Sequence, residues 1–149
     1  MRERINDALK SAMKAQNKRR MSTLRLVTAA IKDRDIAARS SGKERITDGE
    51  ILDVLAKMIK QRRESVETYE GAGRLELAEQ EKEEITIIEE FLPRQLSEAE
   101  TRAAVEAVMA EIGAQGLKDM GRTMAALKER YQGQMDFTKA SALVKDALK

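Results

Sequence analysis

Apolar side chains recur along this chain at intervals of three and four residues, the spacing that places them on one face of an α-helix. No stretch alternates apolar and polar residues as a half-buried β-strand does. Alanine and leucine are abundant and there is a single proline, which also favours helix. The pattern predicts helices at about 2–16, 18–39, 47–71, 74–90, 97–112, 118–131 and 136–148.

Short sequence signals mark where several of these helices begin and end. Thr47 and Glu50 have the spacing of a capping box, in which each side chain satisfies an otherwise unpaired backbone N–H. Ser97 and Glu100 repeat this spacing. Pro93 ends the fourth helix, since a proline disfavours helical geometry in the residue before it. We therefore predict an all-α protein with two helical subdomains: about four longer N-terminal helices in residues 1–92, a linker at 93–97 and a three-helix bundle in residues 98–149.

The composition removes several kinds of chemistry. The 149 residues include no cysteine and no histidine, so the chain lacks thiol nucleophiles, imidazole bases and the commonest metal ligands. It has no tryptophan and only two tyrosines and two phenylalanines, too few for a base-stacking platform. A serine–lysine dyad stays compatible with the sequence, but no glycine-rich strand-to-helix elbow surrounds any serine. We predict no catalytic residue, no metal and no cofactor.

The N-terminus is charged from Arg2 onward, so it lacks the apolar core of a secretory signal peptide. No uncharged run approaches the roughly 18 residues of a membrane span. We expect a soluble, cytoplasmic protein with no membrane partner.

Charge is distributed unevenly, although 28 basic and 26 acidic residues leave a net charge of only +2. Residues 1–63 carry +9, residues 64–92 carry −8, residues 93–116 carry −2 and residues 117–149 carry +3. Such asymmetry fits an anionic partner. It equally fits helices of opposite charge that neutralise each other within the fold, and the sequence leaves both interpretations open.

Basic residues cluster at the start of the second predicted helix and in the middle of the third, where they have the chemistry to contact nucleic-acid phosphates. For the third helix we favour ion pairing with the acidic fourth helix. For the second helix, ion pairing and contact with phosphates are equally supported. Glu81 and Glu84 share one helix face in the densest acidic run. With no histidine to complete a metal site, we expect a solvated face or ion pairs.

The most distinctive local pattern is the segment 117–124. Gly121 lies in the first turn of a predicted helix, where glycine costs up to about 1 kcal/mol relative to alanine. This cost suggests that another backbone or group approaches closely, either a neighbouring helix or a phosphate at the helix N-terminus. Lys118 and Arg122 lie one turn apart on that face, and Lys128 and Arg130 add charge at the other end.

The order and spacing of several short motifs resemble those of a standalone YqeY-like protein of the GatB/YqeY family, over essentially the whole chain. The motifs are Leu24-Arg25-Leu26, Ala29-Ala30-Ile31-Lys32, Lys60-Gln61-Arg62-Arg63-Glu64-Ser65 with Tyr69, Arg74-Leu75-Glu76-Leu77-Ala78 with Glu81 and Glu84, Phe91-Leu92-Pro93, and Asp119-Met120-Gly121-Arg122-Thr123-Met124 with Gly133 and Asp136.

The C-terminal part is similar to the tail domain of GatB, a component of the tRNA-dependent amidotransferase, which amidates misacylated Glu-tRNA(Gln) or Asp-tRNA(Asn). The resemblance implies two all-helical subdomains and a tRNA-facing role for the helix that begins at Lys118 and for the Gly133 turn. Gln134 and Met135 depart from the family pattern, in which a basic and then a small residue often follow the glycine. The catalytic domain of GatB has no counterpart in this sequence.

We therefore expect a non-catalytic module that binds tRNA or a tRNA-handling enzyme. A protein–protein adaptor without nucleic acid is one alternative, and a carbon–nitrogen ligase that uses glutamine as amido donor is another. The residues expected to bind nucleic acid are Lys118, Arg122, Lys128, Arg130, Arg19, Arg20, Arg25, Lys60 and Arg63.

Overall fold

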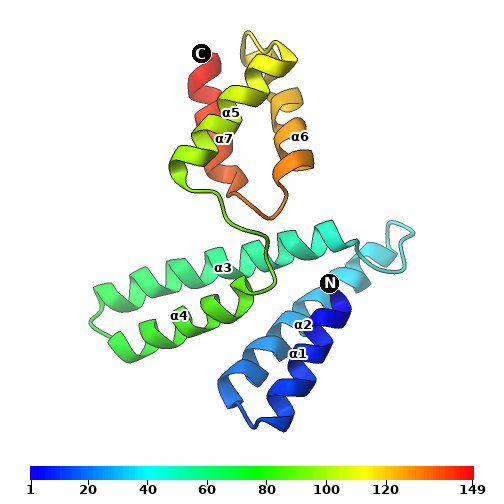
Figure 1. Cartoon of the computed structure of the whole chain (residues 1–149), viewed down its shortest axis with the longest axis vertical. Helices are drawn as coiled ribbons and strands as arrows, with labels where there is room; N and C mark the ends of the chain where they lie inside the picture. Colours follow the sequence, from blue (N-terminus) through cyan, green and yellow to red (C-terminus); the bar gives the residue numbers. More distant parts are fainter. The chain divides into compact units, whose positions relative to one another are not determined.

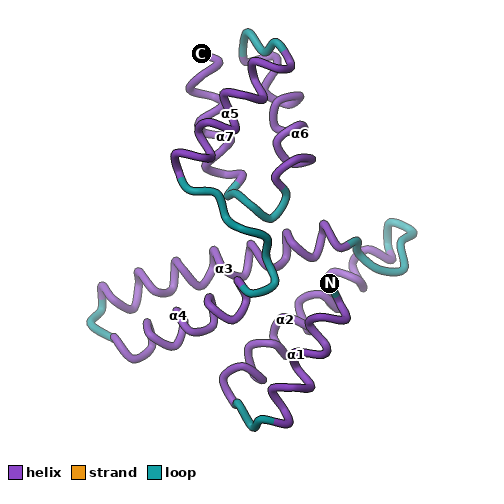
Figure 2. The backbone as a smooth tube through the Cα atoms, in the orientation of Figure 1, coloured by secondary structure: helices purple, strands orange, loops and turns teal.

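The computed structural model describes residues 1–149 and contains helices and connecting loops but no strand, as Figures 1 and 2 show. The all-α prediction is confirmed. The chain divides into two compact units, Met1–Leu92 and Pro93–Lys149. The helices are α1 (Arg2–Lys14), α2 (Lys18–Arg39), α3 (Asp48–Gly71), α4 (Leu75–Glu89), α5 (Glu98–Ile112), a 3-10 turn η1 (Leu117–Asp119), α6 (Met120–Tyr131) and α7 (Phe137–Leu148).

The helix boundaries follow the capping chemistry that the sequence carries. Both predicted capping boxes are present, with the Glu50 backbone N–H donating to the Thr47 hydroxyl at 3.2 Å and the Glu100 N–H donating to the Ser97 hydroxyl at 3.1 Å. At the other end of α3, Gly73 adopts a left-handed φ of +72°, which glycine takes without steric cost. Local sequence therefore decides where α3 and α5 begin and where the α3–α4 turn lies.

The first unit consists of two helical hairpins, α1 with α2 and α3 with α4, and α2 packs against both helices of the second hairpin. Helix packing is driven by the apolar stripe that each helix presents. Leu24 and Val27 of α2, Ile51 and Leu55 of α3 and Ile88 of α4 are completely buried in this core.

The second unit is a bundle of α5, α6 and α7 around Val105, Val108, Leu127 and Val144. Part of the segment expected to be a linker, 93–97, is hydrogen-bonded within this unit. The Leu96 N–H donates to the carbonyl of Gln134 at 2.8 Å, and the Gln95 amide donates to the carbonyl of Gly133. Residues 95 and 96 are thus held by the turn before α7, a tertiary contact that the local sequence does not encode.

One buried ion pair connects α3 to α4. The Arg62 Nε donates to Glu84 Oε2 at 2.9 Å, and the two side chains are only 13% and 9% exposed. Arg62 also donates to the carbonyl of Met58. Nearby, burial and the charge of Glu84 raise the pKa of Glu81. Glu84 therefore forms an ion pair between helices, one of the two interpretations that the sequence favours, whereas Glu81 forms none.

A second polar cluster ties α1, α2 and the chain before α3 together. The guanidinium of Arg2 donates to both carboxylate oxygens of Asp35 at 2.7 and 2.8 Å, and the Ile46 N–H donates to Asp35 Oδ1 at 2.8 Å. Arg2 also donates to the carbonyl of Ile46. The Arg2 guanidinium, and then the Ile46 N–H, lower the pKa of Asp35 from 3.8 to about 2.

Breaking the Arg62–Glu84 pair from one side will destabilise the first unit more than removing both charges. Arg62→Met or Glu84→Leu alone leaves a buried charge without a partner, which costs about 3–5 kcal/mol. The double variant exchanges the pair for apolar side chains and is expected to lie within about 1 kcal/mol of the wild type. The free energy of unfolding from chemical denaturation measures this difference, and additive losses in the double variant would contradict it.

Asp35 will make the stability of the chain depend on acid pH. Because the folded-state pKa of Asp35 is depressed from 3.8 to about 2, its contribution is present above about pH 4 and is lost as the pH falls toward 2. The wild type should therefore exceed Asp35→Asn in melting temperature at pH 6, and this difference should shrink by pH 2. An equal difference at both pH values would show that Asp35 does not act through its charge.

Candidate nucleic-acid interface

Three of the arginines expected to bind nucleic acid face the acidic helix α4 instead of standing alone. Arg19 Nε lies 3.2 Å from a carboxylate oxygen of Glu83, and Arg63 Nη2 lies 3.0 Å from one of Glu89. Arg20 forms an ion pair with Glu90. An incoming phosphate would have to compete with these carboxylates.

The other two predicted residues of the first unit have different surroundings. Arg25 is exposed on α2 and forms no ion pair, so its guanidinium is open to a partner. Lys60 is exposed on α3. The basic cluster of the sequence is therefore divided in the structure, with most of its arginines directed toward α4 and Arg25 toward solvent.

In the second unit two of the predicted cations are paired and two are not. Arg122 Nη2 lies 3.1 Å from Asp119 Oδ1, and both nitrogens at the end of Arg130 donate to the carboxylate of Glu111. Lys118 and Lys128 are exposed and form no ion pair. Among the four predicted residues of this unit, the charge most accessible to an anion is thus on the two lysines.

Gly121 lies on an exposed face of α6 with empty space beside it. A Cβ atom built at this position would meet no atom within 4 Å beyond its chain neighbours and the adjacent backbone of its own helix. The expectation that a neighbouring helix approaches Gly121 is therefore wrong. Ala125, one turn further on, is also exposed. We call the exposed surface formed by Lys118, Gly121, Arg122, Ala125 and Lys128 the α6 face, and Glu129 lies at its far end.

The Gly133 turn, for which the resemblance implies a position facing tRNA, has a structural role. Gly133 is buried at a left-handed φ of +78°, and its carbonyl accepts the hydrogen bond from Gln95. This turn anchors the segment before α5, so its backbone is engaged within the unit.

No group of three or more acidic side chains gathers closely enough to hold a metal ion. No helix is both long and apolar enough to span a membrane.

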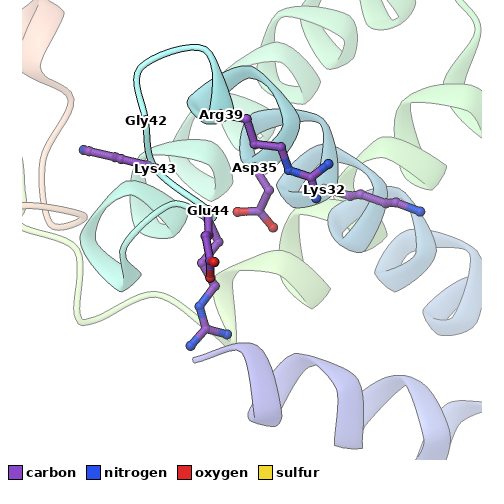
Figure 3. A pocket seen from close by; sticks show the side chains of 7 residues that line it. Lys32, Asp35, Arg39, Gly42, Lys43 and Glu44 are labelled. Atoms are coloured by element: carbon purple, nitrogen blue, oxygen red, sulfur yellow. The ribbon is translucent and has the colours of Figure 1, made fainter.

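One cationic site was missed by the sequence analysis. An open pocket of about 690 Å³ lies between the C-terminal end of α2 and the loop that follows it, and its cationic lining residues are Lys32, Arg39, Lys43 and Arg45. Figure 3 shows Arg39 and Asp35 projecting from α2 beside this loop. The signal in the sequence was the density of basic residues from 32 to 45, but the fold had to bring helix and loop together.

The comparison with known proteins assigns the family. The sequence matches the family model described as "Yqey-like protein" over residues 2–148. The chain belongs to the YqeY-like protein family. This finding confirms the resemblance drawn from the motifs of α2, α3, α4 and α6.

The relatives that this YqeY-like chain matches are fungal proteins. It is 37% identical over 93 residues to an uncharacterized protein of Schizosaccharomyces pombe, covering 62% of this chain and 72% of the relative. It is 35% identical over 106 residues to "Altered inheritance of mitochondria protein 41, mitochondrial" of Lachancea thermotolerans, covering 70% of this chain and 55% of that relative. The protein of the same name from Pyrenophora tritici-repentis is 28% identical over 138 residues, 85% of this chain and 71% of its own length.

These names correct one expectation. The prediction of a cytoplasmic protein is wrong against relatives that are named as mitochondrial. It rested on the lack of an apolar segment. Import into organelles uses amphipathic, basic segments instead. The lack of an apolar segment is therefore no argument against import.

Removing the acidic partners of α4 will expose basic charge. In the triple variant Glu83→Gln, Glu89→Gln and Glu90→Gln, the arginines of α2 and α3 lose their carboxylates. The variant should therefore elute from heparin at higher salt than a control with the same change in net charge. The control is Glu76→Gln, Glu98→Gln and Glu106→Gln, whose carboxylates are exposed and form no ion pair. Equal elution of the two variants would contradict the prediction.

Proposed function

We propose that this YqeY-like protein is a non-catalytic helical module that binds tRNA, with the α6 face as the surface that contacts the sugar–phosphate backbone. Two lines of support lead to this proposal. One is the resemblance, drawn from the sequence motifs, of the C-terminal part to the tail domain of GatB in the tRNA-dependent amidotransferase. The other is Gly121, whose presence in α6 has no explanation within the chain.

Gly121 is the observation that carries the proposal. A glycine inside a helix costs about 0.5–1 kcal/mol relative to alanine, and here no neighbouring atom requires the missing side chain. A partner outside the chain supplies a reason, because a backbone can approach a helix closely only where side chains are small. Ala125, one turn further along α6, also has a small side chain, so this part of the helix surface carries no large side chain over two turns.

The charges around Gly121 suit a polyanion. Lys118 and Lys128 form no ion pair, and they lie at the two ends of the surface formed by Gly121 and Ala125. Arg122 is paired with Asp119, but an exposed pair of this kind is worth only about 0.2–1 kcal/mol and can exchange its carboxylate for a phosphate. Contacts of this type recognise the nucleic-acid backbone and not its sequence.

Docking on a tRNA-handling enzyme is a second candidate, and exposed apolar side chains on α2 favour it. Leu26 is 49% exposed and Ile36 is 50% exposed. Exposed apolar side chains on a helix are typical anchors for a partner protein. Co-purification of a protein that survives nuclease treatment and is lost in the double variant Leu26→Ser and Ile36→Ser would favour this candidate.

Replacing Gly121 with a larger residue is predicted to stabilise the protein and to weaken its binding to tRNA. Gly121→Gln should raise the free energy of unfolding by about 0.5–1 kcal/mol, because glutamine is the better helix former. It should weaken binding to total tRNA about tenfold, which corresponds to about 1.4 kcal/mol. Thermal or chemical denaturation measures the first effect and filter binding or fluorescence anisotropy the second.

The matched control is Ala107→Gln, which places the same side chain on an exposed position of α5 and should leave tRNA affinity unchanged. The double variant Lys118→Gln and Lys128→Gln should also flatten the dependence of log affinity on log salt concentration, by about 0.7 to 0.9 for each phosphate that a lysine no longer neutralises. A stabilised Gly121→Gln protein that binds tRNA as tightly as the wild type would contradict the proposal.

A further inference from the structure

The pocket at the end of α2 belongs to the first unit and has no part in the proposed α6 face. Its volume of about 690 Å³ lies within the range of small-ligand sites, roughly 300–1,000 Å³. It is open to solvent and is bounded by the last two turns of α2 and by the loop of residues 40–45.

The floor of this pocket is held in place by the polar cluster around Asp35. Both oxygens of the Asp35 carboxylate are occupied by the guanidinium of Arg2, and Oδ1 also accepts from the N–H of Ile46. Ile46 itself is buried, with 4% of its surface exposed. The acidic group in the pocket is therefore neutralised, and the end of the loop is fixed relative to α2.

The remaining lining groups are mostly cationic donors without a partner. Lys32 and Arg39 form no ion pair, and Arg45 interacts only electrostatically with Asp35. The backbone N–H groups of Glu44 and Arg45 donate to no acceptor in the chain. Lys43 is engaged elsewhere, since its ammonium lies 3.6 Å from Glu50, and in Figure 3 it points away from Asp35.

Two arginines and free backbone N–H groups form a donor set that suits a phosphate group. A guanidinium presents parallel N–H donors that match the oxygens of a phosphate, and loop N–H groups add neutral donors to the same anion. Glu44 is the one lining carboxylate that is not neutralised by an ion pair, and it opposes an anion. Its removal therefore has the opposite expected sign from removal of an arginine.

We propose that the pocket between α2 and residues 40–45 binds the phosphate group of a phosphorylated ligand through Arg39, Arg45 and the loop N–H groups, with Lys32 contributing charge. The phosphate has two possible sources, a free phosphorylated small molecule or the backbone of an RNA. Both present the same chemistry to the pocket, and the test separates them.

The test uses the whole chain and inorganic pyrophosphate as the probe. Calorimetry should detect saturable binding with a Kd below about 1 mM, and amide NMR should locate the shifts at Gly42, Glu44 and Arg45. Arg39→Gln with Arg45→Gln should weaken binding at least about tenfold, whereas Glu44→Gln should tighten it about threefold. Arg34→Gln, which removes an exposed arginine of α2 outside the lining set, is the matched control and should change nothing.

The outcomes are distinct. Binding that tRNA displaces assigns the pocket to an RNA phosphate, and binding that tRNA leaves untouched assigns it to a small molecule. Either supports the proposal whatever happens at the α6 face, because Gly121→Gln should leave pyrophosphate binding unchanged. No saturable binding, or equal weakening by Arg34→Gln and by the Arg39 and Arg45 double variant in proteins with unchanged melting temperatures, overturns it.

Discussion

In the first unit, arginines of two helices, α2 and α3, pair with the acidic residues of a third, α4. Helix α4 supplies Glu83, Glu84 and Glu89, the next residue is Glu90, and α2 and α3 supply the arginines that pair with them. Only the Arg62–Glu84 pair is buried, and a buried pair adds little net stability while its disruption from one side is costly. The cost of leaving either charge unpaired disfavours other registers of α4 against α3.

Because of this pairing, the basic block in residues 1–63 does not give the first unit a strongly positive net charge. Residues 1–63 carry +9 and residues 64–92 carry −8, so the first unit has a net charge of only +1. Four of the acidic residues in 64–92 contact arginines of α2 or α3. Exposed cations without an ion pair remain in both units. They include Arg25 on α2, Lys32 and Arg39 in the pocket at its C-terminal end, and Lys118 and Lys128 on the α6 face.

In this member of the YqeY-like family, the two cationic surfaces differ in their chemistry. The fold is a pair of helical units without converging acidic side chains that could hold a metal, and histidine and cysteine are absent from the sequence. The α6 face and the α2 pocket use different donors, lysines beside a bare helix surface in one and arginines beside free loop N–H groups in the other, so each can be tested without the other.

The sequence by itself determined the helices and the starts of α3 and α5, because these depend on local chemistry: the spacing of apolar residues and the capping pairs at Thr47 and Ser97. Helix α4 ends at Glu89, before the residue that Pro93 restricts. It also carried the family motifs. Only the tertiary structure decided which charges neutralise one another, since Arg20 and Glu90 are 70 residues apart and meet only when α2 packs on α4. For the same reason Gly121 proved to have no neighbour in the chain, and the loop of residues 40–45 formed a cationic pocket against α2. Charge and spacing along a chain report which groups are present, but their availability depends on which surfaces come together.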